Sequence, residues 1–248
     1  TGGKIMYNRS KVSDGGLAGV IYGEAPNKNN GSFINLSNVT LSHNKTEGRG
    51  GAICGYRVEL TDCNFEDNVA GAQGGAIYSR GTTGYLSIDG CTIRNNAATG
   101  DGGAIYVADS APCTIENSNI SYNSSVVSGG GINATGKLDM TNSTISFNSG
   151  VNGGGIRVSG DCTIDNTIIE HNYATIGGGG IYASGATTIK DSYIRGNRAM
   201  STENGSVDRG RGGGFLFTGN KDITKEDDAV LFTLDNTAVT GNAAMYYG

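Results

Sequence analysis

The stretch GGGIRVSGDCTIDNTIIEHN, from Gly153 to Asn172, holds the sequence elements that decide the fold of this chain. It opens with glycines followed by Ile156 and closes with Ile169, two variable residues and Asn172. Between them, apolar and polar side chains alternate on either side of Asp165-Asn166, a dipeptide that favours a turn. Alternation with period two, broken by a turn, predicts two short strands, and a third strand begins at Ile156.

The same pattern recurs along nearly the whole chain of 248 residues. Repeats start near residues 18, 50, 74, 102, 129, 153, 178 and 212, and the hydrophobic residues that end the Gly-Gly elements lie 24 to 34 residues apart. A second repeated element places one asparagine in each repeat, at Asn44, Asn68, Asn96, Asn123, Asn148, Asn172, Asn197 and Asn242. Residues 1–8 form a partial repeat. Such self-similarity is typical of a repeat protein rather than of separate domains.

A repeat of three short strands without helical periodicity cannot bury its apolar face alone. We therefore predict one all-β domain over residues 1–248, a right-handed parallel β-helix of about eight repeats with three short strands each. The glycine pairs suit corners that need a positive φ or a close backbone approach. The turn between the second and third strands, such as Asp165-Asn166, has Asn, Asp or Gly as its second residue in every repeat. These residue types tolerate the left-handed backbone that such a turn requires. The repeated asparagines are expected to stack as an internal, structural ladder.

The composition argues against several classes of protein. A net charge of −5 and a pI near 5.0, without a basic cluster, argue against nucleic acid as a partner. No apolar run approaches the roughly 18 residues of a membrane span. The five cysteines include no Cys-x-x-Cys pair. Cys63 and Cys91 share an inward column, and we expect them to be free thiols because small apolar side chains suit a core.

The paired motifs resemble a known family of repeats. Gly-Gly-Ala-Ile at 50–53, 74–77 and 102–105, followed by elements such as Phe65 to Asn68, is similar to the repeats of polymorphic outer-membrane proteins and related surface adhesins. The resemblance implies a pectate-lyase-like right-handed β-helix that is secreted or displayed at the cell surface and used for adhesion. It implies a glycan or a protein on a cell surface as the partner.

A carbohydrate-active enzyme is the main alternative, since polysaccharide lyases and glycoside hydrolases also use this fold. Glycoside hydrolysis needs two juxtaposed carboxylates, and lyase chemistry needs a base with a charge neutraliser. Outward carboxylates such as Glu59, Asp139 and Asp165 are scattered, and His43 and His171 lie too many coils apart to form one site. We predict no catalytic residue, metal site or cofactor. An ice-binding solenoid or a subunit of an extracellular filament is a remote alternative.

The candidate binding surface follows the first strand of each repeat. The residues directly after its isoleucine vary and are predicted to face solvent, with Tyr22, Tyr78, Tyr106, Arg157 and Tyr182 as binding candidates. Tyrosines on a rigid sheet suit glycan or protein contacts, although tyrosine also simply suits an exposed strand. A second outward column is rich in threonine, which Thr–Thr pairing explains, and comprises Asn35, Glu59, Ser87, Thr114, Asp139, Thr163, Thr188 and Thr233.

Charge pairs, insertions and the two chain ends carry further predictions. Glu66 with Arg94, and Glu170 with Arg195, are expected to pair across successive coils. Insertions at 23–32, 198–211 and 218–229 are candidate functional loops.

Neither end shows a cap pattern, so we expect the chain to be part of a longer protein or to be covered at its ends by neighbouring subunits or domains. The sequence thus favours a non-enzymatic, adhesin-like or cell-envelope protein that is extracellular or at the cell surface.

Overall fold

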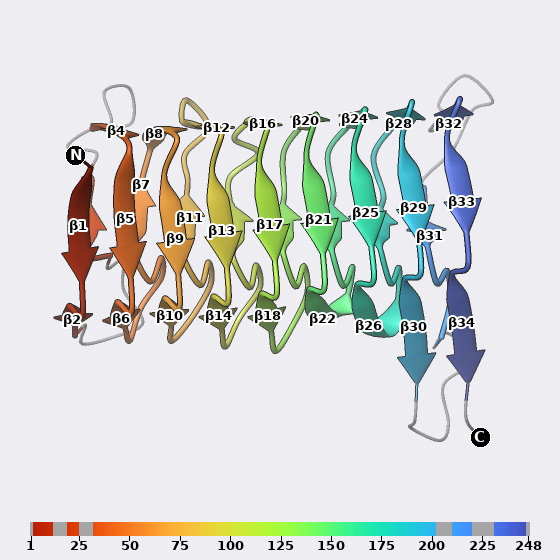
Figure 1. Cartoon of the computed structure of the whole chain (residues 1–248), viewed down its shortest axis with the longest axis horizontal. Coiled ribbons are helices and arrows are strands. Elements are labelled where there is room, and N and C mark those ends of the chain that lie inside the picture. The colour runs from red at the N-terminus through yellow and green to blue at the C-terminus, as the bar shows by residue number, and fades with distance from the viewer. Residues whose placement is uncertain (1, 12–18, 25–31, 202–209, 220–230, 247–248) are drawn as a thin grey trace.

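A computed structural model describes residues 2–11, 19–24, 32–201, 210–219 and 231–246. Within these ranges the chain forms 34 strands and no helix, so no helix there could cross a membrane. The strands lie in four sheets, two of nine strands and two of eight, and each strand pairs in parallel with its counterpart in the next coil. Figure 1 shows the coils succeeding one another along a single axis from the N-terminus to the C-terminus.

We number the sheets in the order in which each coil visits them. Sheet I follows the Gly-Gly elements and contains β3 (Ile21–Tyr22), β7 (Ile53–Gly55), β11 (Ile77–Ser79), β15 (Ile105–Val107), β19 (Ile132–Ala134), β23 (Ile156–Val158), β27 (Ile181–Ala183) and β31 (Phe215–Phe217). Sheet II contains β4 (Phe33–Ser37), β8 (Arg57–Thr61), β12 (Tyr85–Asp89), β16 (Cys113–Glu116), β20 (Leu138–Thr141), β24 (Cys162–Asp165), β28 (Thr187–Lys190) and β32 (Phe232–Asp235).

The other two sheets flank the repeated asparagines. Sheet III precedes them and contains β1 (Gly3–Met6), β5 (Val39–Ser42), β9 (Asn64–Glu66), β13 (Thr92–Arg94), β17 (Asn119–Ser121), β21 (Thr144–Ser146), β25 (Ile168–Glu170), β29 (Tyr193–Arg195) and β33 (Ala238–Thr240). Sheet IV follows them and contains β2 (Arg9–Ser10), β6 (Lys45–Thr46), β10 (Val69–Ala70), β14 (Ala97–Ala98), β18 (Ser124–Ser125), β22 (Ser149–Asn152), β26 (Tyr173–Gly177), β30 (Arg198–Ser201) and β34 (Ala243–Tyr246).

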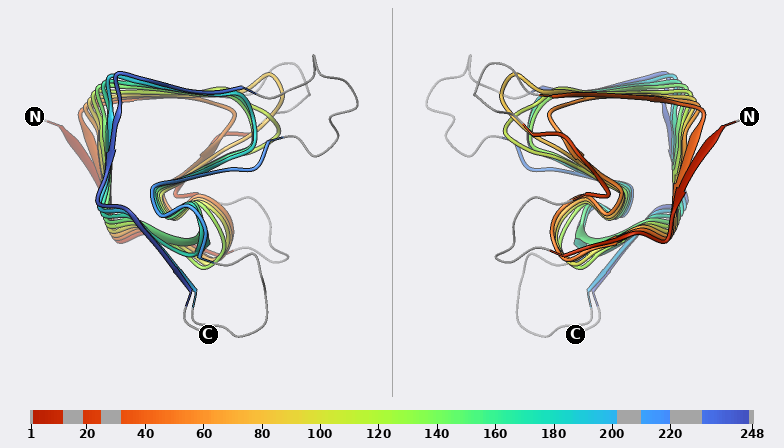
Figure 2. Two further views of the ribbon diagram at one scale, coloured as in Figure 1. Left: turned by 90° about the vertical axis from the view of Figure 1, so that its right-hand side faces the viewer. Right: turned by 90° about the vertical axis from the view of Figure 1, so that its left-hand side faces the viewer.

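The predicted right-handed parallel β-helix is confirmed. Viewed with the C-terminal end toward the reader, each coil runs counterclockwise as the chain approaches the reader (Figure 2, left), which is a right-handed path. The three predicted strands per coil are present as sheets I, II and III. Sheet IV adds a fourth strand to each coil, only two to five residues long. Strands this short show no periodicity in the sequence, which is why the alternation did not reveal them.

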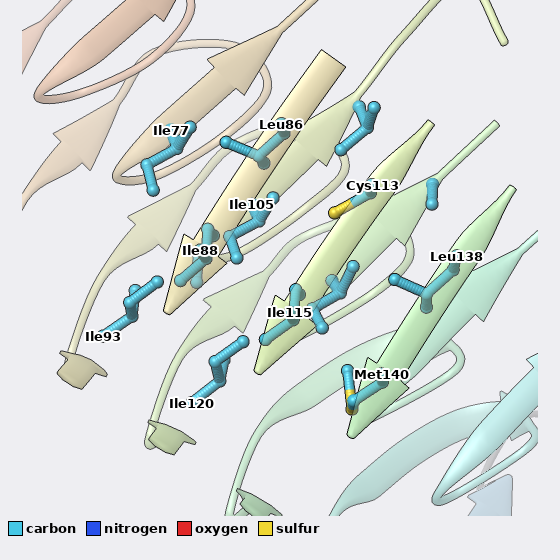
Figure 3. Close-up of a cluster of buried hydrophobic side chains, with 14 of the residues drawn as sticks. Ile77, Leu86, Ile88, Ile93, Ile105, Cys113, Ile115, Ile120, Leu138 and Met140 are labelled. Atoms are coloured by element: carbon cyan, nitrogen blue, oxygen red, sulfur yellow. The ribbon is translucent and has the colours of Figure 1, made fainter. Parts of the chain in front are cut away.

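Apolar side chains from sheets I, II and III fill the interior of the coils in columns. Ile77 pairs with Ile105, and Ile105 with Ile132, so that like residues stack from coil to coil. Figure 3 shows such columns meeting inside the helix, with Ile88 and Ile115 from sheet II beside Ile93 and Ile120 from sheet III. These side chains are fully buried. Each buried isoleucine contributes about 1.5–3 kcal/mol, so stacking supplies the main driving force for this fold.

The two glycines of each pair have different structural roles. Both predicted reasons for them, a positive φ and a close backbone approach, are therefore confirmed. The first, such as Gly102, has a φ of +71°, a conformation that disfavours a side chain. The second, such as Gly103, lies so close to the carbonyl oxygen of Gly130 in the next coil that a Cβ would overlap it. At the corner between sheets II and III, the second turn residue also has a positive φ in every coil. These residues are Asn38, Asp62, Gly90, Asn117, Asn142, Asn166, Asp191 and Asn236.

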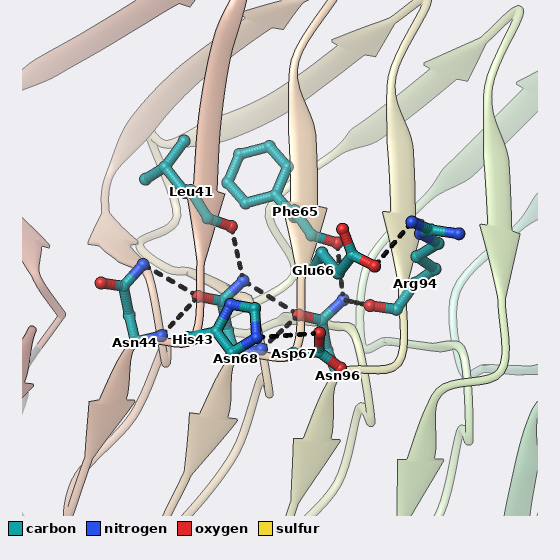
Figure 4. Close-up of polar contacts among 9 residues, drawn as sticks. All are labelled: Leu41, His43, Asn44, Phe65, Glu66, Asp67, Asn68, Arg94 and Asn96. Atoms are coloured by element: carbon teal, nitrogen blue, oxygen red, sulfur yellow. Dashed lines mark hydrogen bonds and ion pairs between the residues drawn. The ribbon is translucent and has the colours of Figure 1, made fainter. Parts of the chain in front are cut away.

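The predicted asparagine ladder is present and runs from Asn8 to Asn242. Figure 4 shows Asn68, whose Nδ2 donates to Oδ1 of Asn96 at 3.0 Å and to the carbonyl of Leu41 at 2.9 Å. Its Oδ1 accepts from the backbone N–H and from Nδ2 of Asn44, at 3.1 and 3.0 Å. Each internal member repeats this arrangement, so one buried side chain per coil satisfies backbone groups that the turn leaves without strand partners.

A second internal ladder, which the sequence analysis missed, follows the corner between sheets II and III. The backbone N–H of Cys91 donates to Oγ of Ser118 at 3.0 Å, and that of Ser118 to Oγ of Ser143 at 3.1 Å. The members are Cys63, Cys91, Ser118, Ser143, Thr167, Ser192 and Thr237. Small hydroxyl and thiol side chains recur here because each must accept from a buried backbone N–H without filling the core.

All five cysteines are buried free thiols, as predicted for Cys63 and Cys91. Burial disfavours the thiolate and raises the pKa of Cys54 and of Cys162 to about 12. The hydrogen bond with Cys91 lowers the pKa of Cys63, but this thiol is only 2% exposed. We therefore expect a thiol reagent at about pH 8 to label essentially none of the five buried thiols in the folded protein, because only thiolates that solvent can reach react. The same reagent in denaturant should count all five. A lower count in denaturant would reveal a disulfide and contradict this assignment.

Candidate functional site

The five predicted binding residues lie in one column on the outer side of sheet I, but their predicted exposure is wrong in part. Register pairing aligns Tyr78 with Tyr106, and Arg157 with Tyr182. Tyr22 is 42% exposed, whereas Tyr106, Arg157 and Tyr182 are half-buried and Tyr78 is only 4% exposed. This column is therefore not a continuous solvent-exposed stripe.

The segment between sheets IV and I explains the correction. After β6 the chain doubles back (Figure 2), and Arg49 places its guanidinium carbon 5.2 Å from the centre of the Tyr78 ring. Arg49 also donates from Nη1 to the Tyr78 hydroxyl at 3.2 Å and from Nε to Gln73 at 2.8 Å. Tyr78 in turn stacks on Tyr106. Burial raises the pKa of both tyrosines, so these phenols stay protonated and serve mainly as packing groups.

A row of stacked, exposed rings lies at the corner between sheets III and IV, at the position that precedes the ladder asparagine. The rings of Tyr122 and Phe147 stack with centroids 4.8 Å apart and planes 3° apart. The Phe147 ring stacks in turn on His171 at 5.2 Å. Tyr122 is 56% exposed and Phe147 is 44% exposed. We call these three side chains the aromatic row.

The aromatic row borders a depression of about 360 Å³ on the outer face of sheet III. It lies between the coils of β13 and β17, and its lining consists of Thr92, Arg94, Asn95, Asn119, Ser121 and Tyr122. All but Ser121 are exposed. A second depression, of about 490 Å³, lies toward the C-terminal end and is lined by Asp191, Tyr193, Leu234, Asn236, Thr237 and Ala238. Four strand spacings, about 19 Å, separate them along the axis.

The charges on the outer face of sheet III are largely paired, as predicted. Arg94 lies 2.6 Å from Glu66, and Arg195 lies 2.7 Å from Glu170. Sheet II differs, since its strands carry six carboxylates and only two cationic side chains. Its predicted outward column from Asn35 to Thr233 is confirmed by the strand register. The two faces therefore present different electrostatics to a ligand.

The two histidines occupy equivalent corners five coils apart, so the prediction that they cannot share a site is confirmed. Nε2 of His43 lies 3.4 Å from Asp67, and His171 belongs to the aromatic row. Among the described residues, no group of three His, Cys, Asp or Glu side chains could hold a metal ion. The central parts of the three insertions, 25–31, 202–209 and 220–230, lie outside the described residues.

The architecture defines the chain as a parallel β-helix protein, and a comparison of its sequence with known families agrees. The family model described as a right-handed beta helix region matches residues 4–137, more than half of the chain. The protein therefore belongs to the right-handed β-helix family. No curated protein and no solved structure matches it. The match does not distinguish the narrower polymorphic outer-membrane-protein group, which stays a prediction.

The aromatic row and the depression beside it are not among the sites predicted from the sequence. Both depend on positions that the hydrophobe-x-x-Asn motif treats as variable. A signal was nevertheless present, because the residue before the ladder asparagine is aromatic or His in three consecutive repeats, at Tyr122, Phe147 and His171. In a solenoid, consecutive repeats stack, so a residue type that recurs at one position forms a surface feature.

Proposed function

We propose that this protein is a non-enzymatic, adhesin-like β-solenoid that is secreted or displayed at the cell surface. The observation that carries the proposal is the pair of stacked, exposed aromatic side chains beside sheet III, where Tyr122 is 56% and Phe147 is 44% exposed. Aromatic side chains held exposed on a rigid scaffold are typical of surfaces that bind a partner. The resemblance of the repeats to those of surface adhesins supports the same function.

The pairing of the carboxylates on sheet III also supports a binding role for that sheet. Glu66 and Glu170 are each held by an arginine of the next coil. A glycosidase needs two free carboxyl groups within about 10 Å across a bound sugar. The depressions of sheet III contain one carboxylate between them, Asp191, which accepts a hydrogen bond from Asn236 and lies 3.5 Å from Lys190. This arrangement suits recognition better than general acid–base chemistry.

Labelled protein should bind saturably to intact cells of at least one type in a panel of bacterial, fungal and animal cells. An antibody against the protein should also label unpermeabilised cells of the source organism. A double variant, Tyr122→Ala with Phe147→Ala, should reduce cell binding by about tenfold or more, since exposed aromatic residues dominate such interfaces. No binding to any cell type, together with labelling only after permeabilisation, would contradict the proposal.

A carbohydrate-active enzyme remains the second candidate. The observation that favours it is the contact between a carboxylate, Glu59, and a phenol, Tyr85, because acid–base catalysis uses such proton acceptors and donors. Oε1 of Glu59 accepts a hydrogen bond from the Tyr85 hydroxyl at 2.6 Å, and Oε2 accepts one from Asn35 at 3.3 Å. The bond to Glu59 raises the pKa of Tyr85, so this phenol stays protonated. Turnover of any member of a panel of neutral and acidic polysaccharides, abolished by Glu59→Gln, would establish the enzyme and overturn the binding proposal.

A further inference from the structure

We propose that the depression between β13 and β17 binds one uncharged sugar ring of a glycan against the free face of Tyr122. The inference deepens the proposed function and rests on it, because it names the ligand class and the place where that ligand is held. Three independent features of the depression support it: an uncovered aromatic face, polar side chains without partners, and charges that are already paired.

Among the described residues, Phe147 is the one ring that stacks on Tyr122 and no cation lies over it, so the opposite ring face is open to the depression that Tyr122 lines. Phe147, in the next coil, covers one face, with the planes only 3° apart. The other face is turned toward the preceding coil, where Asn95 holds the equivalent position and where the depression lies. The apolar C–H face of a pyranose ring packs against such an aromatic face, as other apolar groups do. Tyr122 therefore supplies a platform of the size of a single sugar ring.

The fold does not require aromatic side chains at these corners. Tyr122 and Phe147 have φ values of +57° and +55°, a left-handed conformation that is costly for bulky residues. Four other coils place Asp67, Asn95, Gly196 or Gly241 there, which adopt this conformation more easily, while the first two coils carry a second ring pair, Tyr7 and His43. Stacking of neighbouring rings offsets part of this cost. Aromatic residues at positions where smaller residues suffice indicate a role at the surface.

Four polar side chains around the Tyr122 ring have unused hydrogen-bonding capacity. Within the described part of the chain, the hydroxyl and amide groups of Thr92, Asn95, Asn119 and Ser121 make no hydrogen bond, whereas most other asparagines of the coils donate to a neighbour. Together they offer donors and acceptors from two adjacent coils, that of Tyr122 and the one before it. Sugar hydroxyl groups are donors and acceptors at once, so this set matches a sugar better than an apolar ligand.

The electrostatics and the size of the depression narrow the ligand to an uncharged ring. Among the described residues that line it, the one charged group is Arg94, which is paired with Glu66 at 2.6 Å, so this lining offers no unpaired cation to hold a uronate or a sulfate. Displacing that pair to bind an anion would leave a carboxylate unpaired beside the ligand. The volume of about 360 Å³ lies near the lower end of the range of about 300–1,000 Å³ for ligand sites, as expected for a site that holds one ring.

The depression at Tyr193 provides a matched comparison on the same sheet. It also has an exposed tyrosine, but its polar groups are occupied. Asp191 accepts from Nδ2 of Asn236 at 2.5 Å, and the hydroxyl of Thr237 lies 2.8 Å from the carbonyl of Asp235. The presence of a tyrosine alone therefore does not distinguish the two depressions, whereas the unpartnered polar groups do.

Affinity electrophoresis of the 248-residue chain tests the inference, in gels that contain mannan, galactomannan, xyloglucan, hydroxyethylcellulose or, as the acidic probe, polygalacturonate. We expect at least one neutral polysaccharide to retard the protein and polygalacturonate not to do so. Tyr122→Ala should weaken the retarding interaction by about tenfold or more. Asn119→Ala should weaken it by about three- to tenfold, and Tyr193→Ala should leave it within about twofold. Circular dichroism of each variant verifies that it is folded.

Retardation by none of the neutral polysaccharides, equal retardation by polygalacturonate, or equal loss in Tyr122→Ala and Tyr193→Ala would each overturn the inference. If Tyr122→Ala fails to fold, the exposed Asn119→Ala decides by the same criterion. Cell binding separates this result from the wider proposal. Cells that still retain the protein while every neutral polysaccharide fails would leave the adhesin-like function standing and remove the sugar site. Loss of cell binding, together with retardation by no neutral polysaccharide, would remove both the adhesin-like function and the sugar site.

Discussion

Replacing Asn148 with alanine should lower the free energy of unfolding by about 3 kcal/mol or more. The asparagine side chain makes four hydrogen bonds in the buried ladder. Its Oδ1 accepts two from Asn123, and its Nδ2 donates to Ile120 and Asn172. Alanine would leave the buried backbone N–H of Asn123 without a partner, which costs about 1–3 kcal/mol, and would remove the three other hydrogen bonds of the Asn148 side chain.

Urea denaturation followed by circular dichroism measures this effect, and Asn119→Ala is the matched control. Asn119 lies in the adjacent coil, is exposed, and makes no side-chain hydrogen bond within the described ranges. We expect its replacement to change stability by no more than about 0.5 kcal/mol, as for most surface positions. Equal destabilisation by the two substitutions would show that the ladder does not stabilise the fold.

Gly103→Ala should destabilise the protein by about 3 kcal/mol, or prevent folding altogether. The new Cβ would overlap the carbonyl oxygen of Gly130 and crowd the backbone of Ser124. All of these are backbone atoms, so rotation of a side chain cannot relieve the overlap. The coils would have to separate locally, which would stretch the hydrogen bond that Gly103 donates to the carbonyl of Gly129 at 2.9 Å.

Gly3→Ala serves as the control for the glycine prediction. A Cβ at Gly3 would have Val39 as its nearest neighbour, at 3.9 Å, which is an ordinary van der Waals contact. Its replacement should change the midpoint of urea denaturation only slightly, and in either direction. If Gly103→Ala were tolerated as well as Gly3→Ala, the close approach of successive coils at the glycine pairs would not limit the choice of residue there.

Much of the architecture could be predicted from the repeats because the determinants of a solenoid are local. Ile156, Ile164 and Ile169 each point inward for reasons that lie within a few residues, and the same pattern in the next repeat specifies the partner strand. The ladder asparagines and the corner residues with positive φ follow from the same logic. Stacking of equivalent positions then fixes the parallel register without long-range information.

The surface could not be predicted in this way, because exposure depends on which segment lies over which. Tyr78 points away from the core, yet Arg49 from the preceding turn covers it. Tyr122 and Phe147 are scored as variable by the repeat motif, but the coil spacing brings their rings within 4.8 Å. The depression beside Tyr122 is bounded by side chains of two coils. Alternation in the chain decides which side of a strand is apolar, whereas tertiary packing alone decides which polar positions reach solvent.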